Sequence, residues 1–127
     1  MANPVVHFEI IGPEPDLLRT FYRELFGWTA PPGSPVAPEI SETHNYSFID
    51  TGTAADVGIP GGIGGGTGYS PQALFYVGVE DVASALSAAE RLGGSRVLGP
   101  ARNEEGQVTV GHFRDPAGNL VGVAGPH

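Results

Sequence analysis

His7 and Glu9 are the side chains near the start of this chain best suited to do chemistry. They lie two residues apart in the run 5–10, whose β-branched and apolar residues predict a strand. Because side chains alternate along a strand, the imidazole and the carboxylate face the same side. Together they predict either a general acid/base pair or a site that recognises a polar or cationic ligand. The alternative is a hydrogen-bonded structural histidine, with Glu9 in water near the end of the strand.

Three aromatic residues and a second histidine extend this candidate site. Trp28, Tyr46 and Tyr76 fall in predicted strands, where their rings can form stacking walls for a ligand, and His112 can add a polar group. For Trp28 the alternative is packing in the core, and for His112 it is a place on the surface. We therefore predict ligand binding by Trp28, Tyr46, Tyr76 and His112, with His7 and Glu9 as the catalytic candidates.

The elements that position these residues occur twice. The strand 5–11 precedes a helical pattern at 17–26, and the strand 74–79 precedes a helical pattern at 82–92. Asp16 and Asp81 are the predicted N-caps, and glycines follow both helices. Each half reads β-α-β-β-β, and in the first half the strands after the helix are expected at 28–29, 46–49 and 56–59. We predict an α+β fold of two tandem βαβββ modules forming an open, curved, mixed sheet of eight strands, with the helices on its outer face.

Strand alternation also predicts which residues the helices cover. Phe8, Phe75 and Val77 lie on the opposite face from His7 and Glu9, so they should pack under the helices. Phe21 and Phe26 should belong to the apolar helix face that joins this core.

A glycine-rich run separates the halves. It has no lysine and leads into another strand, so it fits neither a phosphate-binding loop nor a dinucleotide-binding turn. We predict a first module at 1–60, a flexible linker at 61–71 and a second module at 72–127.

The amino-acid composition excludes several classes of function. The net charge of −8 argues against binding nucleic acid and favours cationic ligands. The chain contains no cysteine or lysine, which excludes disulfides, thiol nucleophiles and lysine Schiff bases. The N-terminus does not resemble a signal peptide, and no apolar run is long enough to span a membrane. The sequence therefore predicts a cytoplasmic protein, and its Ala, Gly, Pro, Val and Arg bias is typical of a bacterial gene.

Two motifs carry a family resemblance. The segment 21–28, FYRELFGW, resembles the first helix of the vicinal oxygen chelate superfamily, and 113–119, FRDPAGN, resembles its last hairpin turn. This superfamily holds glyoxalase I, bleomycin-resistance proteins and extradiol dioxygenases. The resemblance implies a metal site with four ligand positions, on the first and last strand of each module. They map onto His7, Gly58, Leu74 and Gly122.

Three of these four side chains have no donor atom, whereas catalytic metal sites use about three protein ligands. We therefore predict no metal and no cofactor. The alternative is a shifted metal site at His7 and Glu9, to which Tyr46, Tyr76 and His112 add donors. The two glycines should leave room for a flat or bulky organic molecule near His7, Glu9, Tyr46 and Tyr76.

The predicted function is small-molecule binding of the glyoxalase/bleomycin-resistance type. The ligand would be cationic or aromatic and would bind between two modules, which either pair within one chain or are exchanged between the chains of a homodimer. The alternative is a lyase, isomerase or dioxygenase of this superfamily, metal-dependent or acid/base, favoured by His7 and Glu9.

Overall fold

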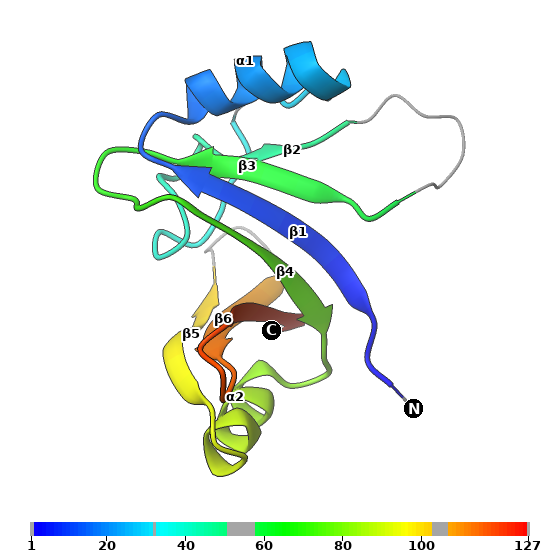
Figure 1. The fold of residues 1–127 in the computed structure, drawn as a ribbon, viewed down its shortest axis with the longest axis vertical. Helices are drawn as coiled ribbons and strands as arrows, with labels where there is room; N and C mark the ends of the chain where they lie inside the picture. The colour runs from blue at the N-terminus through cyan, green and yellow to red at the C-terminus, as the bar shows by residue number, and fades with distance from the viewer. Residues whose placement is uncertain (1, 32, 51–57, 103–106, 127) are drawn as a thin grey trace. The chain divides into compact units, whose positions relative to one another are not determined.

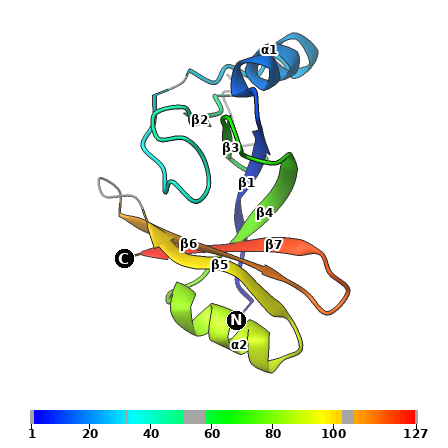
Figure 2. The same ribbon diagram turned by 90° about the vertical axis from the view of Figure 1, so that its left-hand side faces the viewer.

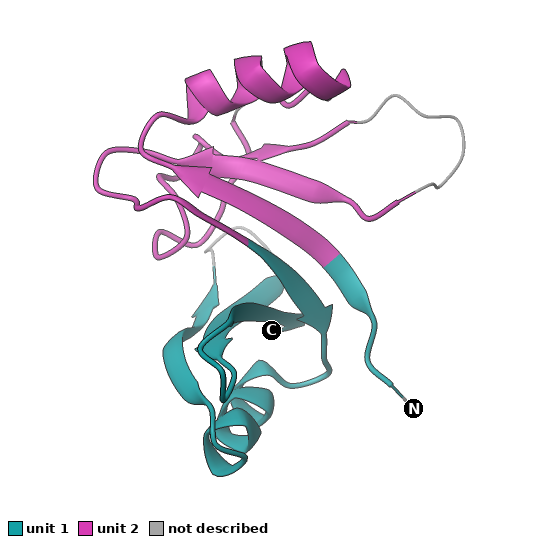
Figure 3. Cartoon of the chain, viewed as in Figure 1, with its two compact units in different colours: residues 1–6, 74–127 teal, residues 7–73 magenta. Residues whose placement is uncertain are grey.

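The structure is a computed structural model that describes residues 2–31, 33–50, 58–102 and 107–126. The chain divides into two compact units (Figure 3). Unit 1 comprises residues 1–6 and 74–127, and unit 2 comprises residues 7–73.

Unit 2 contains most of strand β1 (Val5–Gly12), then helix α1 (Pro15–Phe26) and strands β2 (Ser47–Phe48) and β3 (Gly61–Gly65). Strand β3 runs in the middle, parallel to β1 and antiparallel to β2. Helix α1 lies along one side of this small sheet (Figure 1).

Local sequence explains where α1 begins and ends. Pro15 occupies the first turn, where its missing N–H is not needed. Gly27 ends the helix in the left-handed conformation at φ 76°, as its type predicts. The prediction of Asp16 as the N-cap is wrong. The helix begins two residues earlier, at Pro15 after Glu14, so Asp16 lies in the first turn and pairs there with Arg19.

An aromatic cluster packs between α1 and the sheet of unit 2. The Trp28 ring stacks on Tyr22 at 5.5 Å between centroids and contacts Phe8 at 5.5 Å. Phe8 therefore packs on the helix side, as strand alternation predicts. Phe21 and Phe26 differ from the prediction, because both are more than half exposed. Phe21 shares its exposed stripe with Leu17 and Leu25, one helical turn before and after it, while Tyr22 faces the sheet.

The glycine-rich segment is not simply a flexible link. Its residues 61–65 form β3, and all five are buried. Glycine is needed there because neighbouring side chains fill the space beside the strand. A Cβ at Gly61 would collide with the Phe8 ring, and one at Gly62 with the Tyr46 hydroxyl. The strand expected at 56–59 lies partly outside the described residues, and Gly58–Pro60 are not in a strand.

Unit 1 contains most of β4 (Gln72–Gly78), then α2 (Val82–Arg91), β5 (Ser95–Arg102), β6 (Val108–Arg114) and β7 (Leu120–Pro126). This confirms the β-α-β-β-β order of the second half. Strand β4 is parallel to β7, and β7, β6 and β5 follow in antiparallel order. Helix α2 covers one face of β5, β6 and β7 (Figure 2).

The core of unit 1 forms where α2 meets this sheet. Val82 and Leu86 of the helix pack on Val123 of β7, with Phe113 of β6 beside them. The Asp81 side chain accepts a hydrogen bond from the Ser84 N–H, which confirms the predicted N-cap. The expectation that Phe75 packs under a helix is wrong, since it is 43% exposed. Helix α2 crosses β5, β6 and β7, whereas β4 lies at the edge of this unit's sheet.

The α+β class with mixed strand pairing and two helices is confirmed. The described residues contain seven strands rather than eight. The missing strand was expected at Trp28 and Thr29, where a single bridge joins Thr29 to Asp50. Within the described part of the chain, neither helix has the length and apolar character needed to cross a bilayer.

Candidate functional site

Tyr46 connects the two polar side chains of β1 in unit 2. Its hydroxyl donates a hydrogen bond to Glu9 Oε1 at 2.9 Å and lies 2.9 Å from His7 Nε2. Because the hydroxyl hydrogen is directed at Glu9, the His7 Nε2–H is the donor in the second bond. The three groups form one chain of donors and acceptors, His7 to Tyr46 to Glu9. The structure thus brings together three of the six predicted site residues.

Burial sets the protonation of this chain. Tyr46 and Glu9 are nearly inaccessible to solvent. Desolvation, followed by the charge and the hydrogen bond of Glu9, raises the pKa of Tyr46 well above its ordinary value. Desolvation also lowers the pKa of His7. Tyr46 is therefore a neutral hydrogen-bond donor at neutral pH, and His7 is a mostly neutral imidazole.

Glycines of β3 create the space that Tyr46 occupies. Cβ atoms at Gly62 or Gly64 would collide with the Tyr46 side chain. Neither glycine has a positive φ, so the requirement for glycine here is steric rather than conformational.

Phe48 adds an exposed aromatic surface that the sequence analysis missed. Its ring lies edge-on to His7 at 6.0 Å and to Tyr46 at 5.5 Å, and the residue is 57% exposed. The available signal was strand alternation, since Phe48 follows Tyr46 by two residues and so faces the same side. An exposed aromatic ring beside a buried polar chain can stack on a flat or cationic ligand.

A second histidine–tyrosine pair lies in unit 1. The Tyr76 hydroxyl and His112 Nε2 are 2.7 Å apart, and both residues are buried. Burial lowers the pKa of His112 to about 4, so its imidazole is neutral at physiological pH. The pair lies beside Gly122, where a Cβ would come within 2.5 Å of the Tyr76 ring. The structure thus pairs Tyr76 and His112, two of the predicted ligand-binding residues, with each other.

Trp28 does not belong to the hydrogen-bonded series of His7, Tyr46 and Glu9. It belongs to the aromatic cluster with Phe8 and Tyr22, and Phe8 faces the opposite side of β1 from His7 and Glu9.

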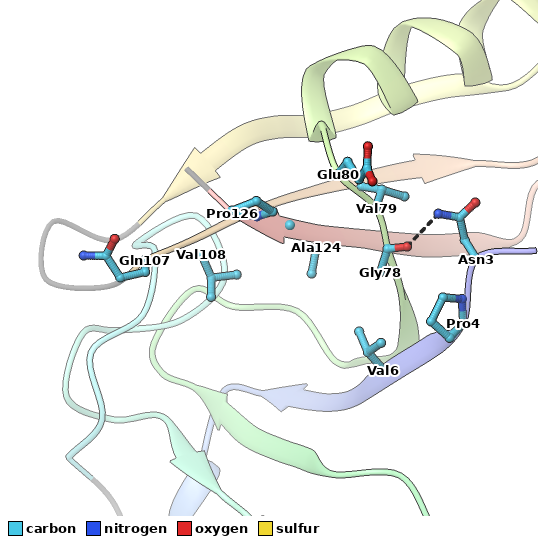
Figure 4. Close-up of a pocket in the computed structure, with 11 residues that line it drawn as sticks. Asn3, Pro4, Val6, Gly78, Val79, Glu80, Gln107, Val108, Ala124 and Pro126 are labelled. Carbon is cyan, nitrogen blue, oxygen red and sulfur yellow. Dashed lines mark hydrogen bonds between the residues drawn. The ribbon is translucent and has the colours of Figure 1, made fainter. Parts of the chain in front are cut away.

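An open hollow lies at one end of the unit 1 sheet (Figure 4). It has a volume of 590 Å³ and is lined mainly by apolar side chains and glycines, with Glu80 and Gln107 among its polar members. The Asn3 side-chain amide is already engaged, because it donates to the Gly78 carbonyl at 2.9 Å. The predicted site residues do not line this hollow.

The sequence matches a known protein family over nearly its whole length. Residues 5–123 match the model of the Glyoxalase/Bleomycin resistance protein/Dioxygenase superfamily. The chain belongs to this superfamily. Members share a fold and differ in chemistry, so membership fixes the architecture and leaves the activity open. No curated protein gives a significant sequence match.

Solved structures of methylmalonyl-CoA epimerases are similar in fold to this glyoxalase superfamily chain. The Streptomyces coelicolor enzyme in complex with 2-nitronate-propionyl-CoA has a TM-score of 0.65 at 13% identity, covering 99% of this chain and 96% of that one. The Mycobacterium tuberculosis enzyme has a TM-score of 0.62 at 12% identity, covering 97% and 87%. A hypothetical protein from Bacillus halodurans C-125 has a TM-score of 0.65 at 11% identity, covering 100% and 96%.

The register of the strands corrects one of the mapped ligand positions. Tyr76 pairs with Gly122 in unit 1, and in unit 2 the equivalent pair is Glu9 with Gly62. The counterpart of Gly122 is therefore Gly62 rather than Gly58, because β3 begins only at Gly61.

The residues present do not fit the metal that the superfamily implies. At the corrected positions only His7 carries a donor atom, and the described residues hold no group of three or more His, Cys, Asp or Glu that could bind an ion. The sequence predicts open space beside Gly58 and Gly122. The space beside Gly58 is open, but Tyr76 fills that beside Gly122, and Tyr46 fills that beside Gly62.

Proposed function

We propose that this protein binds a small organic molecule on the face of unit 2 that carries His7, Tyr46 and Glu9, and that it does so without the divalent metal of its catalytic relatives. One observation carries the proposal. The Tyr46 hydroxyl occupies the space of a side chain at Gly62 and hydrogen-bonds both His7 and Glu9. The hydrogen-bonded side chains of His7, Tyr46 and Glu9 thus occupy the place where the resemblance implies a metal ligand.

The ligand class follows from the groups around this chain. Phe48 offers an exposed ring next to His7, and the net charge of −8 favours cations. The ligand is therefore flat or cationic and small, with an aromatic or positively charged group stacked on Phe48 and a polar group near His7. We also propose that the protein is a cytoplasmic homodimer of bacterial type.

A second candidate function is acid/base isomerisation of a small substrate. The observation in its favour is that Glu9 accepts a hydrogen bond from Tyr46, so that a carboxylate base and a hydroxyl donor lie 2.9 Å apart. The similar folds of methylmalonyl-CoA epimerases make acyl-CoA thioesters reasonable test compounds.

The two candidates are separated by thermal-shift screening of the untagged protein against antibiotics, metabolites and acyl-CoA thioesters, since a bound ligand raises stability by mass action. A ligand that stabilises the wild type and loses affinity in both Phe48→Ala and His7→Ala supports the binding site. Unchanged affinity in both variants overturns it. Solvent deuterium incorporation into a bound thioester, lost in Glu9→Gln, identifies the isomerase.

Elemental analysis tests the metal-free part of the proposal. The expected result is less than stoichiometric transition metal after purification without a histidine tag. About one tightly bound equivalent per chain, as in sites with three protein ligands, overturns this part.

A further inference from the structure

Arg19 is a buried arginine that reaches from the first half of α1 to the segment around Tyr46. The residue is 9% exposed. Its guanidinium donates to the Asn45 carbonyl at 3.3 Å and to Ser47 Oγ at 2.9 Å. It also donates to Asn45 Oδ1 at 2.7 Å and to Asp16 Oδ1 at 2.7 Å.

Three of these four bonds end on the two residues that flank Tyr46. The planar guanidinium presents its donors in a fixed fork, so bonds to Asn45 and Ser47 constrain both the position and the direction of the chain between them. Asp16 is a weaker partner, because its side chain is 92% exposed and water screens the pair.

Backbone pairing around Tyr46 is short, and the bond from the Asn45 side-chain amide to Glu42 Oε1 at 3.1 Å is exposed. Strand β2 contains only Ser47 and Phe48, and at Tyr46 itself an isolated bridge joins Ser34 to the chain. A two-residue strand contributes little pairing energy, so a buried side-chain fork is well suited to hold the tyrosine.

We propose that Arg19 is the positioning residue of this site: by fixing Asn45 and Ser47, it holds the Tyr46 hydroxyl between His7 and Glu9. Arg19 acts on the site through the two residues on either side of Tyr46. This inference rests on the proposed function, because the hydroxyl that Arg19 of α1 positions belongs to the proposed binding face. Its geometry does not depend on which ligand binds.

The test compares Arg19→Met with Asp16→Ala by NMR titration of His7 in the unliganded protein. Asp16→Ala is the matched control, because it removes the exposed partner and leaves the bonds to Asn45 and Ser47. In Arg19→Met, Tyr46 no longer shields His7 from water, so the desolvation that lowers the His7 pKa is relieved and the pKa rises toward its ordinary value of 6.5. In Asp16→Ala it stays at the wild-type value. The His7 signal is assigned with a His7→Asn variant.

A folded Arg19→Met protein with an unchanged His7 pKa overturns the proposal, even if its stability falls. A shift of equal size in Asp16→Ala overturns it as well. If Arg19→Met does not fold, the same titration on Ser47→Ala decides, with a shift in the same direction expected and no shift contradicting the proposal. No ligand enters this experiment. A library screen without a hit therefore counts against the proposed function and leaves the result for Arg19 standing.

Discussion

Tyr46 contacts four neighbours with one side chain. Its ring covers Gly62 and Gly64, and its hydroxyl satisfies Glu9 and His7. A buried carboxylate is costly unless it is hydrogen-bonded, so the hydroxyl contributes to folding as well as to the proposed binding face.

Tyr46→Phe should lower the free energy of unfolding by about 1 to 3 kcal/mol, because a buried carboxylate loses a hydrogen bond and the ring remains. Tyr69→Phe is the matched control. Its hydroxyl also makes a hydrogen bond, to the Pro38 carbonyl, but in an exposed setting where water can replace it. Urea unfolding monitored by circular dichroism measures both. Equal losses in the two variants would contradict a special role for Tyr46.

His112 should make the stability of unit 1 depend on pH. Its pKa of about 4 in the folded state lies below the ordinary value of 6.5, so between these values the unfolded chain binds a proton that the folded chain does not. The free energy of unfolding should therefore fall as the pH drops from 6.5 to 4, by about 3 kcal/mol.

His112→Gln keeps a polar partner for Tyr76 and removes the titration, so its unfolding free energy should vary less over this range. His44→Gln, the same substitution at an exposed histidine, is made alongside for comparison. An unchanged slope in His112→Gln would show that other groups cause the acid sensitivity.

At the scale of elements, β3 shows how a glycine-rich run can be an interior strand. The strand lies between β1 and β2, and its missing side chains admit Phe8 on one face and Tyr46 on the other. A pattern of glycines carries no hydrophobic alternation, so neither period 2 nor period 3.6 appears in the sequence. Only the large side chains of neighbouring elements reveal why the strand is apolar and buried.

Gly62→Ala should destabilise the fold by about 3 kcal/mol, at the upper end of the range for overpacking, because the new methyl group would displace the Tyr46 hydroxyl. Gly12→Ala is the comparison, since its Cβ would meet only the flexible Leu18 side chain at 3.1 Å. Thermal unfolding and crystal structures of both variants check this. If Gly62→Ala is as stable as Gly12→Ala, Tyr46 does not fill this space.

At the scale of the whole molecule, the chain leaves apolar side chains uncovered. Leu17, Phe21 and Leu25 are 57–62% exposed along one side of α1. We expect a homodimer, because the two units are small and this stripe would gain from being covered. Sedimentation velocity at micromolar concentration should give the mass of two chains, and Phe21→Glu should shift the equilibrium toward one. A wild-type monomer under these conditions would contradict the prediction.

Some features of this protein could be predicted from sequence because they depend on local order. The segments FYRELFGW and FRDPAGN, the repeated strand-helix pattern and the Asp81 cap identify the superfamily and the α+β class. Alternation along β1 was enough to place His7 and Glu9 on one face, opposite Phe8. The absence of donor atoms at three of the four mapped ligand positions also follows from residue types alone.

The remaining features required the tertiary structure, because they depend on which segments become neighbours in space. The bonds from Tyr46 to His7 and Glu9 join residues 39 and 37 positions apart, and no local pattern reports such a distance. The role of Arg19 also depends on residues distant in the sequence. In the sequence it is an ordinary charged residue of a helix, whereas in the structure it donates hydrogen bonds to both neighbours of Tyr46. The sequence predicted space beside Gly58 and Gly122. Packing decided that tyrosines fill the space beside Gly62 and Gly122, since folded interiors leave few voids.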